Sequence, residues 1–186
     1  MSITNSEITS VVTAYLDRYS LETMLLAEPI RLLGQGHDAA SRRTFPMHVT
    51  VGALLIRGGT EVLLVGHRAY GITLQPGGHL EPTDTTLIDA AVRELVEETG
   101  IDADAVVAVS ESPVYIEYGR VPARPLKDEP EHFHLDLGYG FATVAGDVGC
   151  IQESEVTSAA WYPLGEAQRL VGTRIARVSS APGGVG

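Results

Sequence analysis

The sequence predicts an α/β or α+β domain built on a mixed β-sheet, which is a sheet with both parallel and antiparallel strands. Apolar and β-branched runs alternate with only a few helical segments, which favours this class. The 186 residues suit one domain with an appendage. A composition that is 44% hydrophobic and 20% charged is too apolar for a disordered chain.

The first 46 residues are predicted to form a helical extension. Thr4 and Glu7 have the spacing of a capping box, and apolar residues follow at helical intervals. Ser20 can cap a second helix that runs through Leu33 and ends at Gly34. We identify no chemistry in this extension.

Residues 47–172 are predicted to form the main domain. Strands are expected at 49–56 and 61–65, joined across Gly58-Gly59, and later at 106–109, 114–118, 132–144 and 156–162. A Pro-Gly-Gly loop at 76–78 precedes a helix from about 85 to 99, and a short helix is expected at about 166–171. The Gly-rich residues 173–186 are expected to form a C-terminal tail.

The charge balance narrows the function classes. Thirteen Lys and Arg against 24 Asp and Glu give a net charge of -11, which disfavours a nucleic-acid or membrane-binding surface. The single cysteine, Cys150, cannot form an internal disulfide or a thiolate zinc site. No start resembling a signal peptide and no apolar run of ~20 residues is visible, so we expect a cytoplasmic protein.

The helix at 85–99 carries the strongest chemical signal. Glu94, Glu97 and Glu98 fall within roughly 100° of its surface, beside an apolar stripe. Unless solvent screens them, carboxylates this close need a cation or raised pKa values. Arg93 can pair with Glu97, and oxygen ligands favour Mg²⁺ or Mn²⁺. The backbone carbonyl of Gly78 can serve as a further metal ligand. The alternative to a metal site is an acidic helix face that is simply exposed to solvent.

These residues resemble the Nudix box of the Nudix hydrolases (MutT-like). The box runs glycine, five residues, glutamate, seven residues, then Arg-Glu-apolar-any-Glu-Glu-any-Gly-apolar. Gly78 fits the first position, and the second half is matched in full by Arg93-Glu94-Leu95-Val96-Glu97-Glu98-Thr99-Gly100-Ile101. Asp84 stands where the box has glutamate, and eight residues rather than seven separate it from Arg93. The flanking organisation agrees over roughly two thirds of the chain.

The resemblance implies an α/β/α sandwich around a mixed sheet. It implies hydrolysis of a pyrophosphate bond in a nucleoside diphosphate linked to another moiety, by water activated on Mg²⁺ or Mn²⁺. By similarity Glu94, Glu97 and Glu98 are metal ligands or bases, Gly78 is a further metal contact, and Arg93 orients a carboxylate. The partner would be a small nucleotide derivative, and dimers are frequent in the family.

A second cluster lies on the predicted strand 132–144. His132, His134 and Asp136 share one strand face, next to Glu131. This row can supply a base, a metal ligand or a phosphate contact, or it can be a solvated strand face. Because Nudix enzymes often use a further carboxylate from outside the box, Glu131 and Asp136 are candidates. A zinc site of His132, His134 and Asp136 is disfavoured, since residues along one strand lie too far apart without outside ligands.

Several single residues are weaker candidates. His79 lies in the box loop and His48 starts the first strand of the main domain, so either can touch substrate, although lone histidines are more often structural. Four cations near the expected cleft are candidate phosphate contacts: Arg68, Arg120, Arg124 and Lys127.

Two other function classes remain open. One is a Nudix-fold module that binds a nucleotide without turnover, which the three crowded glutamates disfavour. The other is an isomerase acting on an isoprenoid diphosphate. That chemistry uses a cysteine in the related family, and Cys150 lies far from the box in sequence.

Overall fold

A computed structural model describes residues 3–125, 128–144 and 146–178. Its centre is an eight-stranded mixed sheet, which confirms the predicted fold class. Five strands follow one another as hydrogen-bonded neighbours, in the order β3 (Ile72–Leu74), β2 (Glu61–His67), β1 (Met47–Arg57), β7 (His132–Thr143) and β5 (Val107–Ala108). The strands β4 (Gly77–His79), β6 (Tyr115–Val121) and β8 (Val156–Pro163) pair with β1, β7 and β2 respectively.

The parallel pair of β1 and β7 forms the middle of the sheet. Its register runs from Met47 beside Phe133 to Arg57 beside Thr143, so His48 lies beside His134. The other strand pairs are antiparallel. β1 pairs with β4 near its start and with β2 only at its end, so the short β4 occupies the edge that β2 leaves open.

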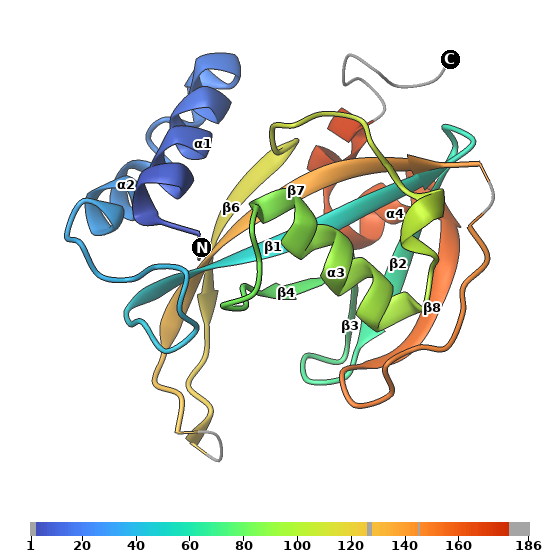
Figure 1. The fold of residues 1–186 in the computed structure, drawn as a ribbon. Helices are drawn as coiled ribbons and strands as arrows, with labels where there is room; N and C mark the ends of the chain where they lie inside the picture. Colours follow the sequence, from blue (N-terminus) through green and yellow to red (C-terminus); the bar gives the residue numbers. More distant parts are fainter. Residues whose placement is uncertain (1–2, 126–127, 145, 179–186) are drawn as a thin grey trace.

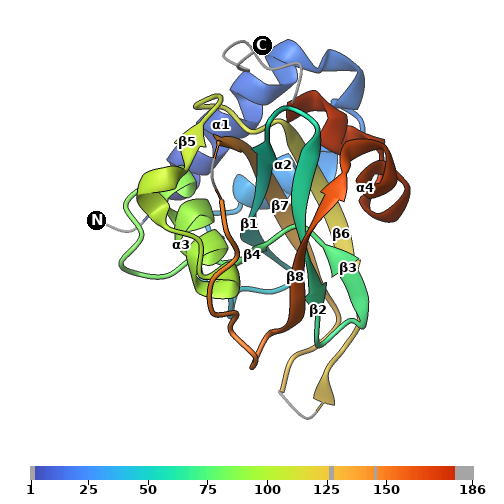
Figure 2. The same ribbon diagram turned by 90° about the vertical axis from the view of Figure 1, so that its right-hand side faces the viewer.

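Helices cover both faces of the sheet, as Figures 1 and 2 show. The helix α3 (Leu87–Thr99) shares one apolar core with Val49, Val51 and Leu55 of β1. On the other face, the alternate β1 residues Leu54 and Ile56 pack in a second core. The helix α4 (Leu164–Val171) and the 3-10 helix η4 (Thr173–Val178) contribute to that second core. This is the α/β/α layering that the family resemblance implies.

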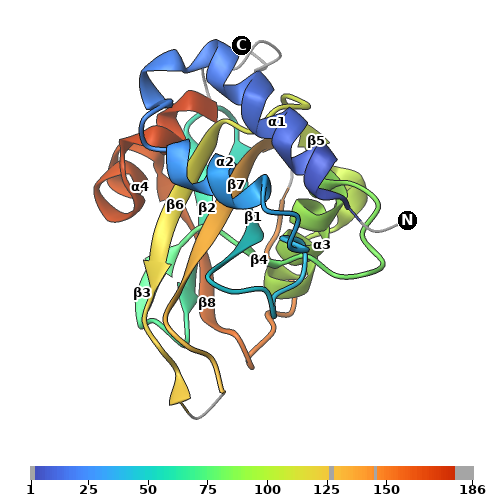
Figure 3. The ribbon, with the colours of Figure 1, turned by 90° about the vertical axis from the view of Figure 1, so that its left-hand side faces the viewer.

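The N-terminal helices lie beside β6 and β7 at one edge of the sheet (Figures 1 and 3). Thr4 and Glu7 form the expected capping box at the start of α1 (Asn5–Arg18). The second helix is shorter than predicted: residues Ser20–Glu22 form a 3-10 turn (η1), and α2 spans Ala27–Leu33. Pro29 explains the difference, because proline is tolerated in a first helical turn but breaks a helix that already runs through it.

The C-terminal segment is partly packed. Residues Thr173–Val178, which the sequence analysis assigns to the tail, form η4 and bury Ile175 and Val178. Arg177 donates to Glu22 at 2.6 Å and to the Tyr15 hydroxyl at 2.8 Å, which ties η4 to the N-terminal helices. The rest of the predicted tail, 179–186, lies outside the described residues.

Candidate active site

Two glutamates of α3 are buried against the loop and strand that precede the helix. Glu98 is 1% exposed and Glu94 6%, whereas 44% of the Glu97 side chain is exposed. The Glu94 carboxylate lies so close to Gly78 that a Cβ there would meet it at 2.6 Å. Glycine at this position therefore allows the carboxylate and the β4 backbone to approach each other.

Glu98 has one carboxylate oxygen engaged and one orphaned. Its Oε2 accepts a hydrogen bond from the Gly77 amide at 3.0 Å. Its Oε1 is buried and has no hydrogen-bond partner within the described part of the chain. Buried carboxylate oxygens rarely lack a hydrogen-bond partner, which indicates that this oxygen binds a ligand. Together with Glu94 and the adjacent backbone it forms an all-oxygen donor set, which fits Mg²⁺ or Mn²⁺.

Burial makes both carboxylates reluctant to ionise. It raises the pKa of Glu98 to about 8 and that of Glu94 to about 7. Arg93 opposes the rise at Glu94, while the charges of Glu97 and Glu155 add to it at both sites. Glu155 precedes β8 and is a carboxylate that the sequence analysis missed, because no local pattern connects it to α3.

Arg93 connects the parts of this site. Its guanidinium donates to Asp84 at 3.0 Å through two nitrogens and to the His79 carbonyl at 2.9 Å. The same group donates to Glu94 at 3.0 Å and to Glu97 at 3.1 Å. Its predicted pairing with Glu97 is therefore one of four contacts, and these fix β4, the following loop and the acidic helix face together.

Asp84 supports the loop before the helix, and its contact with the acidic helix face runs through Arg93. Burial opposes its ionisation, but the two hydrogen bonds from Arg93 hold its pKa below the usual value. It also accepts from the Glu81 amide at 2.7 Å. Helix α3 is capped by Thr86, whose side chain accepts from the Asp89 amide at 3.0 Å, while Asp84 is paired with Arg93. Gly100 ends the helix in the left-handed conformation, which glycine adopts readily.

We expect Gly78→Ala to disable this site with little effect on folding. The new methyl group would displace the Glu94 carboxylate, whose position a Mg²⁺ site requires. Mg²⁺ affinity, measured by calorimetry, should fall by about 10- to 100-fold, as for a disturbed ligand support. Gly119→Ala is the matched control, because a Cβ at Gly119 would meet nothing within 4 Å. An unchanged Mg²⁺ affinity in Gly78→Ala would argue against Glu94 as a ligand.

Four histidines meet on the sheet face opposite α3, where β1, β4 and β7 begin or end. Ring centroids lie 4.7 Å apart for His48 and His134, 5.1 Å for His48 and His79, and 5.1 Å for His132 and His134. Burial lowers the pKa of His79 to about 3 and that of His134 to about 2, so both rings are neutral at physiological pH. The predicted row is thus completed by His48 and His79 from neighbouring strands.

The two carboxylates predicted beside this row are engaged elsewhere. Asp136 accepts from Thr50 at 2.8 Å and from the Tyr115 hydroxyl at 2.7 Å, and it is buried deeply enough that its pKa is raised. Glu131 pairs with Arg120 beside the β6–β7 hairpin. Neither contact directs these carboxylates toward α3, so their predicted catalytic role gains no support.

The predicted phosphate contacts are spread over the surface. Arg68 is exposed, and its amide donates to the Glu155 carbonyl at 2.8 Å. Arg124 pairs with Glu129 at 3.9 Å and lies over the Tyr70 ring. Lys127 lies outside the described residues.

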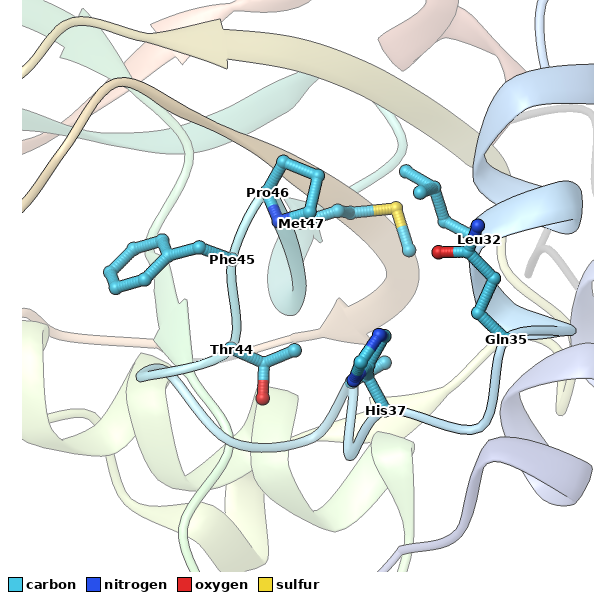
Figure 4. A pocket seen from close by; sticks show the side chains of 8 residues that line it. Leu32, Gln35, His37, Thr44, Phe45, Pro46 and Met47 are labelled. Carbon is cyan, nitrogen blue, oxygen red and sulfur yellow. The ribbon is translucent and has the colours of Figure 1, made fainter.

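Two cavities lie away from the glutamates. The one in Figure 4, between the segment after α2 and the start of β1, has a volume of about 10 Å³, enough for one water. A second, of about 160 Å³, lies between α1 and the start of α3 and is lined by Val11, Leu87 and Tyr139 among others. Neither includes a predicted catalytic side chain.

Comparison with known proteins identifies the family. Residues 46–180 match the NUDIX domain family. The chain belongs to this family. This confirms the resemblance that Gly78 and residues 93–101 indicate, and the box residues occupy the site described above.

The individual proteins that match this chain do so over a short segment or at low sequence identity. The phosphatase NudJ of Escherichia coli K12 is 49% identical over 61 residues, which cover 32% of this chain and 39% of NudJ. The match thus spans less than half the length of that relative. The Ap4A hydrolase of C. elegans covers 71% of this chain and 95% of its own, with a TM-score of 0.56 and 19% identity. A NUDIX hydrolase of Clostridium perfringens has a TM-score of 0.53 and 18% identity, covering 73% and 95% of the two chains. Both likenesses show the fold.

Proposed function

We propose that this chain hydrolyses a pyrophosphate bond in a nucleoside diphosphate linked to another moiety, with Mg²⁺ or Mn²⁺ as cofactor. The observation that carries the proposal is the orphaned Oε1 of Glu98, buried next to the Glu94 carboxylate and the Gly77–Gly78 backbone. A protein that needed these side chains only for folding would gain stability by replacing them with neutral ones. Membership of the NUDIX family supports the same chemistry.

The residues divide the work as follows. Glu94, Glu97 and Glu98 would hold the divalent cation, with the Gly78 backbone beside them. When bound, the cation would neutralise phosphate oxygens and acidify a water for attack on phosphorus. Arg93 holds Glu94 and Glu97 in position through its guanidinium. Oε1 of Glu98, which has no hydrogen-bond partner among the described residues, is the oxygen through which Glu98 would hold the cation.

The group attached to the diphosphate is a separate question. One structural neighbour is named an Ap4A hydrolase, which is a name for an enzyme that acts on a nucleotide derivative. We extend to this chain only the shared chemistry, a phosphoanhydride next to a nucleoside. Among the described residues no helix is long and apolar enough to cross a membrane. A cytoplasmic location and a homodimer stay predictions.

The direct test is phosphate release from a panel of nucleoside diphosphate derivatives with Mg²⁺, Mn²⁺ or EDTA. A coupled phosphatase reports products that are not free phosphate. We expect turnover of one compound class with either metal and none with EDTA. If no compound is turned over but some raise the melting temperature, the chain is instead the binding module considered above.

The two buried glutamates predict an unusual pH dependence. Their pKa values are raised from the ordinary 4.5 to about 7 and about 8. Ionisation of either buried carboxyl group therefore destabilises the folded state relative to the unfolded state. The free energy of unfolding of the metal-free protein should therefore fall as the pH rises from about 4.5 through about 8. Because Mg²⁺ binds the ionised carboxylates, its stabilising effect should grow over the same range.

Thermal melts between pH 5 and pH 9, with EDTA and with Mg²⁺, test this expectation. The Mg²⁺-induced rise in melting temperature should be larger at high pH. The variant Glu98→Gln should flatten both trends, while a rise that is the same at every pH would contradict the assignment of these carboxylates as ligands.

A further inference from the structure

Three of the four histidines bring their nitrogens close enough to share one ion. The ligand nitrogens of His48, His79 and His134 all lie within 4.8 Å of one another. Nitrogens bonded to a tetrahedral Zn²⁺ at about 2.0–2.1 Å are about 3.4 Å apart. The ligand nitrogens therefore need to approach one another by at most about 1.4 Å to bind one tetrahedral ion.

His48 is oriented as a metal ligand. Its Nδ1 lies 3.2 Å from the Thr44 carbonyl oxygen, which can only accept, so Nδ1 carries the proton. Its Nε2 then presents a lone pair, yet this atom is buried without a hydrogen-bond partner within the described residues. A histidine whose other nitrogen donates to a backbone carbonyl is the usual arrangement in metal sites. The ring is 1% exposed, so water does not readily satisfy it.

His132 repeats this arrangement at the edge of the cluster. Its Nδ1 lies 2.8 Å from the Pro130 carbonyl oxygen, so its Nε2 also presents a lone pair. That Nε2 accepts a hydrogen bond from Nε2 of His134 at 3.1 Å, and an ion bound by both rings would replace the proton between them. Two nearby arginines, Arg42 and Arg124, each pair with Glu129, at 3.5 Å and 3.9 Å, which offsets their repulsion of a cation.

We propose that His48, His79 and His134 bind one first-row transition-metal ion, with Zn²⁺ as the first candidate and His132 placed to supply a fourth nitrogen. Imidazole nitrogens favour Zn²⁺, Ni²⁺ or Cu²⁺, whereas Mg²⁺ favours the oxygens of the glutamate site. The site is thus distinct from that of the proposed hydrolysis and does not depend on it.

Such an ion would connect three strands. It would fasten β4 to β1 and β7 through His79, whose own carbonyl oxygen is held by Arg93. The backbone of Gly78 lies against Glu94 and precedes His79, so the ion would also limit movement of the loop before α3.

Cobalt provides the test, since Co²⁺ bound by four tetrahedral ligands absorbs visible light much more strongly than hydrated Co²⁺. The full chain, stripped of metal, is titrated with Co²⁺ and then with Zn²⁺ against a chelator of known affinity. We expect one tetrahedral Co²⁺ spectrum that one equivalent of Zn²⁺ displaces. His79→Gln and His134→Gln should each weaken Zn²⁺ binding by at least about 100-fold, more than an indirect support would.

Two control variants distinguish binding at the histidine cluster from binding elsewhere on the chain. His37→Gln changes an exposed histidine outside the cluster and should leave Zn²⁺ affinity unchanged. Glu98→Gln removes a ligand of the proposed Mg²⁺ site and should also keep the Co²⁺ spectrum. Circular dichroism checks folding, and the half-buried His79 serves as the second variant if His134→Gln does not fold.

The opposite results would overturn the proposal. They are a wild-type protein with no tetrahedral Co²⁺ spectrum, folded His79→Gln and His134→Gln variants with unchanged Zn²⁺ affinity, or a spectrum that only Glu98→Gln abolishes. Because each readout is metal binding and not hydrolysis, a failed activity panel would leave this result unaffected.

Discussion

Glu98→Gln is expected to lower metal-dependent turnover by at least about 100-fold, because the loss of a metal ligand should cost more than the loss of a side chain that only supports one. Glutamine keeps the size of the side chain and can still accept from the Gly77 amide through its oxygen. Its NH₂ group then replaces the orphaned Oε1, so a donor points to the place where a cation would bind. Steady-state kcat under saturating Mg²⁺ is the measurement.

The same substitution should not harm the fold. It removes a buried acid that is 1% exposed and whose second oxygen has no hydrogen-bond partner among the described residues. The melting temperature of the metal-free variant should match or exceed that of the wild type at pH 8. Glu166→Gln, an exposed change on α4, is the control and should leave both kcat and stability unchanged. Full activity in Glu98→Gln would remove this carboxylate from the mechanism.

The acidic site was predictable because its pattern is local. Glu94, Glu97 and Glu98 share one helix, so the helical repeat alone places them together beside Arg93. The predicted helix over 20–33 was wrong because it placed Pro29 in the middle of a helix, where proline is disfavoured. In the structure Pro29 lies in the first turn of the shorter helix α2.

The histidine cluster was not predictable in the same way. The parallel register of β1 and β7 puts His48 beside His134, and the pairing of β4 with β1 adds His79. Such registers depend on how distant strands pair, and no periodicity along one strand reveals them. β4 itself has the sequence Gly-Gly-His, which has low strand propensity, and it forms because β1 offers a free edge. Considered alone, His132, His134 and Asp136 therefore looked too widely spaced for a metal.

The second large effect is expected for Arg93→Ala. The guanidinium is 20% exposed and the Asp84 carboxylate 5%, so the substitution leaves a buried charge without its partner. Breaking a buried pair in this way costs about 3–5 kcal/mol of unfolding free energy, or roughly 6–20 °C in melting temperature for a domain of this size. Urea unfolding at pH 7 measures the change.

Arg31→Ala is the matched control, because Arg31 pairs with Glu28 on an exposed helix surface and its loss should change stability little. Arg93→Lys separates charge from geometry. Lysine keeps the positive charge but cannot donate at once to Asp84, the His79 carbonyl and Glu94, so stability should recover in part while turnover stays low. If Arg93→Lys restores turnover to the wild-type level, the arginine contributes charge alone. If Arg93→Ala unfolds like the wild type, the link between β4 and the acidic helix face lies elsewhere.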